Sequence, residues 1–158
     1  IAALADRAGP PGGGDRPAAL VLAGLPGAGQ AEFSTWEAEL DARTTCPVHR
    51  GTLTEDPEVA HGSFAAPVPD DLLDAARAGT SALPHLILAG DRDPLTDQDA
   101  TALLADKLPR ARFGVVHGAH HDVLDDQQHR TVAAEIVTFL ESLRAGLAPL
   151  LTVETSAW

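Results

Sequence analysis

Two short stretches of the chain combine an apolar run with side chains that can transfer protons. In the first, the apolar residues 86–89 lead into GDRDP at 90–94. In the second, residues 113–116 lead into HGAHHD at 117–122. A carboxylate that orients an imidazole is the arrangement that lets histidine act as a general base. The two stretches therefore predict a carboxylate–histidine pair.

The elements that would position this pair are strands followed by helices. Residues 86–89 and 113–116 are predicted strands, and the short apolar run 19–23 predicts a third strand, buried on both faces. Open α/β sheets place ligands at the carboxyl ends of their strands, where both polar groups occur. Strands that alternate with helices predict an α/β fold with a parallel sheet and helices on both faces.

Helices are expected around and after these strands. Amphipathic patterns predict helices at 32–43 and 70–78. Thr96 and Asp99 resemble a capping box at the start of a third helix. Asp125 and Asp126 precede a final apolar stripe, where their carboxylates would favour the helix dipole.

The chain divides into four predicted parts. Residues 1–24 would supply the end of a helix and a core strand, and residues 81–146 the later part of the α/β core. Between them, residues 25–80 lack strand periodicity and predict a mainly helical lid or cap insertion. Residues 147–158 would form a carboxyl-terminal extension.

Composition excludes several classes of partner. The net charge is −12, which disfavours nucleic acid and anionic membrane surfaces as partners. Cys46 is the only cysteine, so no internal disulfide can form. The longest apolar runs fall well short of the ~20 residues that span a bilayer. These features predict a cytoplasmic protein with no membrane span.

The motif LILAGDRDPLT at 86–96, followed by ARFGVVHGAHHDVLDD at 111–126, resembles the carboxyl-terminal half of an α/β-hydrolase. The similarity extends over roughly four-fifths of the chain, and it is strongest to the lysophospholipase-like esterases of actinobacteria. In that family an acid follows the seventh core strand and a histidine follows the eighth. The resemblance places the acid at Asp93 and the histidine at His121, and it makes residues 19–23 the sixth core strand.

The resemblance implies a serine hydrolase that cleaves a small ester or thioester with a Ser-His-Asp triad. His121 would accept and return the proton of the nucleophile, while Asp93 would orient the imidazole. The lid would supply apolar surface to the substrate pocket through Phe33, Trp36 and Phe64. This chemistry needs no cofactor and no metal.

The nucleophile of such a triad is missing from these residues. No G-x-S-x-G motif occurs in the 158 residues, and the family order is nucleophile, acid, histidine. Ser34, Ser63 and Ser81 do not sit at a strand-to-helix elbow. The serine is therefore expected upstream of Ile1, with residues 1–8 as the end of the elbow helix. An amino-terminal half, in the same or a companion chain, would be the partner, and the chain alone would be inactive.

Other interpretations remain open. The glycine-rich segment 24–31 imitates a P-loop, but Gln30 and Ala31 replace its lysine and its Mg²⁺-binding hydroxyl, which favours a plain turn. The turn with His117, His120, His121 and Asp122 could hold a metal, although adjacent turn residues rarely converge on one ion.

Asp93 and His121 could also serve only as turn and strand-end residues. In that case the chain would be a non-catalytic pseudo-hydrolase that binds a small ligand.

Overall fold

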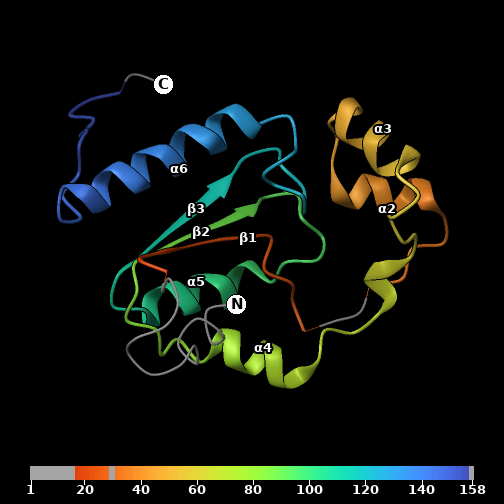
Figure 1. Cartoon of the computed structure of the whole chain (residues 1–158), viewed down its shortest axis with the longest axis horizontal. Helices are drawn as coiled ribbons and strands as arrows, with labels where there is room; N and C mark the ends of the chain where they lie inside the picture. Colours follow the sequence, from red (N-terminus) through yellow and green to blue (C-terminus); the bar gives the residue numbers. More distant parts are fainter. Residues whose placement is uncertain (1–16, 29–30, 157–158) are drawn as a thin grey trace.

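A three-stranded parallel sheet forms the centre of the molecule (Figure 1). The computed structural model describes residues 17–28 and 31–156. The strands are β1 (Leu20–Ala23), β2 (His85–Gly90) and β3 (Ala111–Val116), in the spatial order β1-β2-β3. The predicted parallel sheet is confirmed.

The middle strand, β2, is the centre of the core, and all six of its residues are buried. Successive side chains of a strand point to opposite faces of its sheet. Accordingly, Leu86 and Leu88 pack with Phe139 in one apolar cluster, while Ile87 packs with Leu104 in a second cluster. The uninterrupted apolar run of this strand follows from burial on both faces.

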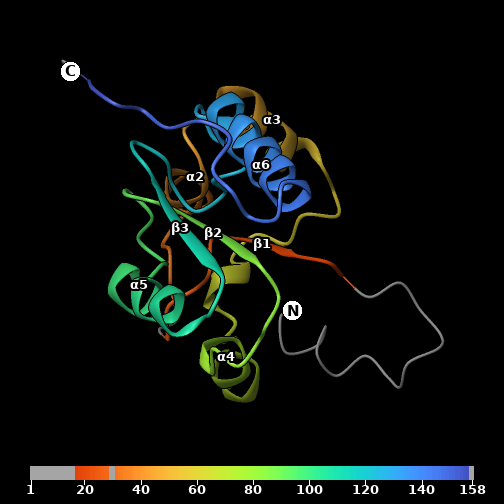
Figure 2. The same cartoon turned by 90° about the vertical axis from the view of Figure 1, so that its left-hand side faces the viewer.

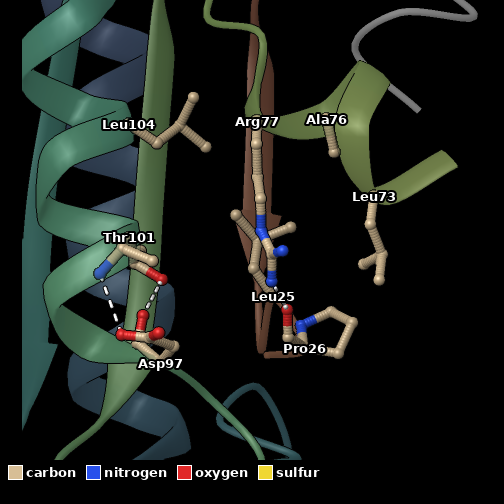
Figure 3. Close-up of a pocket in the computed structure, with 9 residues that line it drawn as sticks. Leu25, Pro26, Leu73, Ala76, Arg77, Asp97, Thr101 and Leu104 are labelled. Atoms are coloured by element: carbon tan, nitrogen blue, oxygen red, sulfur yellow. Dashed lines mark hydrogen bonds between the residues drawn. The ribbon is translucent and has the colours of Figure 1, made fainter. Parts of the chain in front are cut away.

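Helices cover both faces of the sheet. Helix α6 (His129–Arg144) lies on one face, and α5 (Gln98–Lys107) with α4 (Asp70–Arg77) lies on the other (Figures 1 and 2). Between α4 and α5 is a small cavity of about 40 Å³ (Figure 3). There Arg77 extends toward β1 and donates a hydrogen bond to the carbonyl oxygen of Pro26 over 3.3 Å.

The start of α5 differs from the predicted capping box. Asp97 is the N-cap, and its side chain accepts a hydrogen bond from the backbone N–H of Ala100 over 2.9 Å. Thr96 does not cap the helix because its hydroxyl bonds to the carboxylate of Asp93, three residues earlier in the same turn. The prediction was wrong because it paired Thr96 with Asp99 and overlooked this bond to Asp93.

The start of α6 also differs from the prediction. The helix begins at His129, three residues after Asp126, and Gln128 is its N-cap. Asp126 therefore does not act through the helix dipole. The two oxygens of its carboxylate instead accept hydrogen bonds from the backbone N–H groups of Thr45 and His120.

Two helices lie beyond the carboxyl ends of the strands (Figure 1). They are α2 (Trp36–Arg43) and α3 (Pro47–Glu55), followed by a short 3₁₀ turn, η1 (Ser63–Ala65). Helix α2 starts after Thr35, whose side chain accepts a hydrogen bond from Ala38 N. The segment expected to form a lid, residues 25–80, is divided between two places. Its elements α2, α3 and η1 lie at the carboxyl ends of the strands, whereas α4 lies beside α5.

The remaining predicted parts are described only in part. Residues 1–8, expected to end the elbow helix, lie outside the described residues. Residues 147–156 contain no helix or strand. No helix in the described ranges has the length and apolar character needed to cross a bilayer.

Candidate active site

Asp93 and His121 meet at the carboxyl ends of β2 and β3. The Nδ1 atom of His121 lies 2.9 Å from Oδ2 of Asp93. An ionised carboxylate can only accept a hydrogen bond, so Nδ1 carries the proton in this contact. The imidazole is thereby fixed in the tautomer whose Nε2 has a free lone pair. This geometry can accept a proton at Nε2 while Asp93 stabilises the resulting positive charge.

The carboxylate of Asp93 is itself held by three donors. Its side chain is fully buried, and Oδ1 accepts hydrogen bonds from the backbone N–H groups of Leu95 and Thr96 over 2.8 and 3.3 Å. The Thr96 hydroxyl donates to Oδ2 over 2.6 Å. Burial alone would raise the pKa of Asp93, but the hydrogen bonds from His121 and Thr96 outweigh it and lower the pKa below its ordinary value. Asp93 is therefore ionised at neutral pH.

Two glycines allow the histidine turn to approach the strand ends. Gly90 ends β2, and a Cβ atom there would overlap the carbonyl oxygen of Ala119. Gly24 follows β1 with φ +60°, and a Cβ atom there would lie 2.6 Å from the carbonyl oxygen of His121. A larger residue at either position would push the turn away from the sheet.

The glycine-rich segment that resembled a P-loop packs against the acid turn. The backbone N–H of Gly27 donates to the carbonyl oxygen of Leu95 over 2.6 Å. The Leu25 carbonyl oxygen lies 2.8 Å from the Thr96 hydroxyl. Residues 24–28 thus support the loop that carries Asp93. Gln30, which stands in place of the P-loop lysine, lies outside the described part.

Each histidine of the turn bonds to a different aspartate. His117 Nδ1 contacts Asp91 Oδ2 at 2.9 Å on the exposed side of the turn. His120 Nδ1 contacts the buried carboxylate of Asp126 at 3.1 Å. Within residues 17–28 and 31–156, no three His, Cys, Asp or Glu side chains converge on a possible metal position.

The histidine turn is attached to helices α2 and α3 by its backbone and by Asp122. The N–H groups of His121 and Asp122 donate to the last carbonyl oxygens of α2, those of Ala42 and Arg43, over 3.2 and 2.8 Å. The Asp122 carboxylate lies 3.0 Å from His49 Nε2 on α3. The turn that carries the general-base candidate is therefore in direct contact with α2 and α3.

The aromatic residues expected in the pocket occupy different places. Phe64 meets the imidazole of His121 edge-on, with ring centroids 5.1 Å apart. Phe33 packs against Phe64 with centroids 6.2 Å apart. Trp36 stacks on His61 instead, with centroids 3.8 Å apart. Phe64 and Phe33 thus extend an apolar path away from His121.

A cavity of about 310 Å³ opens beside His121. It is bordered by the end of β1 and by the turn that carries the histidine, and its lining residues are Ala23, His49, His121, Asp122, Val123, Leu124 and Asp125. The imidazole therefore borders a space large enough to admit reacting groups from outside the described residues.

Thr96 and Asp126 were not predicted as parts of the site. For Thr96 a signal was available, because a hydroxyl three residues after an aspartate often bonds back to that side chain. Asp126 carried no comparable local signal, since its partners at 44 and 45 are about eighty residues away in the sequence.

The sequence model of the TAP-like protein family matches residues 65–146, slightly more than half of the chain and including Asp93 and His121. The chain belongs to the TAP-like family of α/β-hydrolases. The resemblance inferred from the two strand-end motifs is therefore confirmed at the level of the superfamily. No curated protein matches the chain by sequence.

Solved structures show the same α/β-hydrolase fold. The Paleococcus ferrophilus monoacylglycerol lipase is 19% identical, with a TM-score of 0.63 over 81% of this chain and 60% of that chain. A soluble variant of the Saccharomyces cerevisiae monoglyceride lipase, solved with a substrate analog, is 16% identical, with a TM-score of 0.51 over 71% of this chain and 41% of that chain. The α/β-hydrolase chain thus spans less than two thirds of these structures.

Proposed function

We propose that this chain supplies the acid and the histidine of a serine hydrolase that cleaves an ester or a thioester. The observation that carries the proposal is the 2.9 Å contact between His121 Nδ1 and the buried Asp93 carboxylate. It fixes the imidazole tautomer that general-base catalysis requires.

In the proposed reaction His121 Nε2 removes the proton of a serine hydroxyl as the oxygen attacks the carbonyl carbon of the substrate. The imidazolium then donates this proton to the departing alkoxide or thiolate, which leaves an acyl-enzyme. A water molecule, deprotonated in the same way, releases the acid. Asp93 stays ionised and stabilises each imidazolium.

The serine would come from polypeptide outside the 158 residues. The chain has no G-x-S-x-G motif, and among the described residues β1 pairs with β2 alone. The second edge of β1, which pairs with no strand among the described residues, would be the place of a further strand. Ser63 and Ser81 instead accept hydrogen bonds from Arg43 and Leu83.

The substrate would place its acyl part along the apolar path that starts at Phe64. Phe64 and Phe33 provide this surface, with Trp36 farther along the lid. Monoacylglycerols are suitable test substrates because the two solved structures are named for them. Short-chain thioesters test the alternative leaving group.

The test compares the 158-residue chain with the protein that also contains the serine-bearing segment. We expect ester hydrolysis by the longer protein only, with loss of turnover in His121→Ala and retention in His117→Ala, whose ring is 86% exposed. Hydrolysis that survives loss of the serine and stops on chelation would favour a metal mechanism. Ligand binding without turnover would favour a pseudo-hydrolase.

A further inference from the structure

Asp126 joins the lid to the histidine turn. Its side chain is fully buried. Oδ1 accepts hydrogen bonds from the hydroxyls of Thr44 and Thr45 and from the N–H of Thr45, over 3.1, 2.8 and 2.9 Å. Oδ2 accepts hydrogen bonds from the N–H and the ring of His120, over 2.8 and 3.1 Å. One oxygen therefore faces the connection between α2 and α3, and the other faces the residue before His121.

The carboxylate is held in its charged form. Burial alone would raise the pKa of Asp126, but the hydrogen bonds from His120, Thr45 and Gln127 lower it far below the ordinary range. Hydrogen bonds to an ionised acceptor are stronger than those between neutral groups. The junction is therefore a charged network and not an incidental polar contact.

A second set of contacts lies beside this carboxylate. The last carbonyl groups of a helix lack partners within the helix. In α2, the carbonyl groups of Ala42 and Arg43 accept from the N–H groups of His121 and Asp122. These bonds require the backbone of the turn to lie directly against the end of α2. Asp126 bonds to both sides of the same junction.

We propose that Asp126 is a positioning residue that aligns His121 by fixing its turn to the end of the lid helix α2. The inference rests on the proposed function, because His121 is the group that is positioned. It implies that the His121 imidazole and the carboxyl end of α2 keep the same relative position during turnover. Lid motion would then occur in the parts of the lid farther from Thr44 and Thr45.

The first variant tests the oxygen that faces His120 separately from the oxygen that faces Thr44 and Thr45. Asp126→Asn keeps one acceptor oxygen for Thr44 and Thr45, but its amide nitrogen cannot accept from His120. A misplacement of about 1 Å can cost about 100-fold in rate. We therefore expect kcat to fall about 10- to 100-fold, with KM within about twofold, because the substrate surface is unchanged.

The matched control is Asp91→Asn. Asp91 also bonds to a histidine ring and a backbone N–H of the same turn, those of His117 and Gly118. These bonds lie on the exposed side of the turn, so the control should keep kcat within about twofold. An equal loss in both variants would overturn the inference, since it would show that any support of the turn has the same effect.

Amide hydrogen exchange tests the alignment without any assay of activity. In Asp126→Asn, the amides of His121 and Asp122 should exchange faster, while the amide of Ile87 in β2 should not. Thr45→Val removes one hydroxyl and keeps the backbone donor, so it should shift the same two amides by a smaller amount. Unchanged exchange at the turn, or equal acceleration at Ile87, would overturn the inference.

The two kinds of measurement distinguish failure of the inference from failure of the proposed function. If the protein with its serine segment shows no hydrolysis, the proposed function fails, and the exchange data still decide whether Asp126 aligns the turn. If hydrolysis occurs and kcat is unchanged in Asp126→Asn, the positioning role alone is wrong.

Discussion

Strand β2 and helix α3 are held in place by different forces. Every residue of β2 is buried, and its side chains join two apolar clusters. Helix α3, in the segment expected to form a lid, has no buried residue. Helix α2 buries Leu40 and Ala42, and hydrogen bonds at the end of α2, Thr44, Thr45 and Asp122 join both helices to the strand framework.

The candidate active site draws on both regions. Asp93 and His121 belong to the framework, and their contact depends on the ends of β2 and β3. The surface that would select a substrate belongs to the lid. Changes to the framework should therefore alter catalysis or folding strongly, and changes to the lid should alter activity while the fold remains.

The largest expected effect is on catalysis within the framework. Asp93→Asn removes the acceptor that fixes the His121 tautomer, and we expect kcat of the complete protein to fall about 10³- to 10⁴-fold. Steady-state ester hydrolysis measures this loss. The matched variant Asp91→Asn, on the exposed side of the turn, should retain nearly full turnover, and a loss below tenfold in Asp93→Asn would contradict the role of the acid.

The second prediction compares core burial in the two regions. Ile87→Ala in β2 removes a fully buried side chain, and we expect a loss of about 2–5 kcal/mol in the free energy of unfolding. Val48→Ala in α3, where the side chain is 76% exposed, should change it by less than about 0.5 kcal/mol. Chemical denaturation of the complete protein measures both, and equal losses would show that the lid is as tightly packed as the sheet.

The third prediction concerns the lid surface next to the base. Phe64→Ala removes the ring that contacts His121 and lies under the Arg43 guanidinium. An aromatic contact of this kind is worth about 1 kcal/mol, so we expect kcat/KM for a long-chain ester to fall about fivefold. Leu151→Ala, in the exposed tail, is the control. An unchanged kcat/KM would remove Phe64 from the substrate surface.

The smallest expected effect is a change in acid stability. The pKa of Asp126 is lower in the folded protein than its ordinary value of 3.8. Its contribution to the free energy of unfolding is therefore complete above that value and is lost as the pH falls below it. Asp126→Asn should show a weaker decrease in stability between about pH 5 and pH 3 than the unmodified protein. Parallel pH profiles in denaturation experiments would contradict this account.

The sequence predicted the strands better than the starts of helices α5 and α6 for a physical reason. The apolar run at 86–89 has few alternatives to a buried strand, and the polar residues after it must then lie at the sheet edge. The contact between Asp93 and His121 follows from two neighbouring parallel strands. Such a local pattern predicts structure well, because a strand that is buried on both faces requires a continuous apolar run.

The errors arose at two helix starts, where one side chain has a different local partner and the other has a distant one. Thr96 has the sequence of a helix cap, but its hydroxyl bonds to Asp93, and Asp97 caps the helix instead. Asp126 has the sequence of a helix-dipole residue, yet it bonds to Thr44 and Thr45 across the fold. No pattern within a few residues can reveal a partner about eighty positions away.

The most direct test of the central claim is labelling by a serine-reactive fluorophosphonate, followed by mass spectrometry of the modified peptide. The reagent should modify one serine outside the 158 residues, and the labelling rate should fall sharply in His121→Ala but not in His117→Ala. Modification of a serine within this chain, or equal labelling of the two histidine variants, would contradict the account.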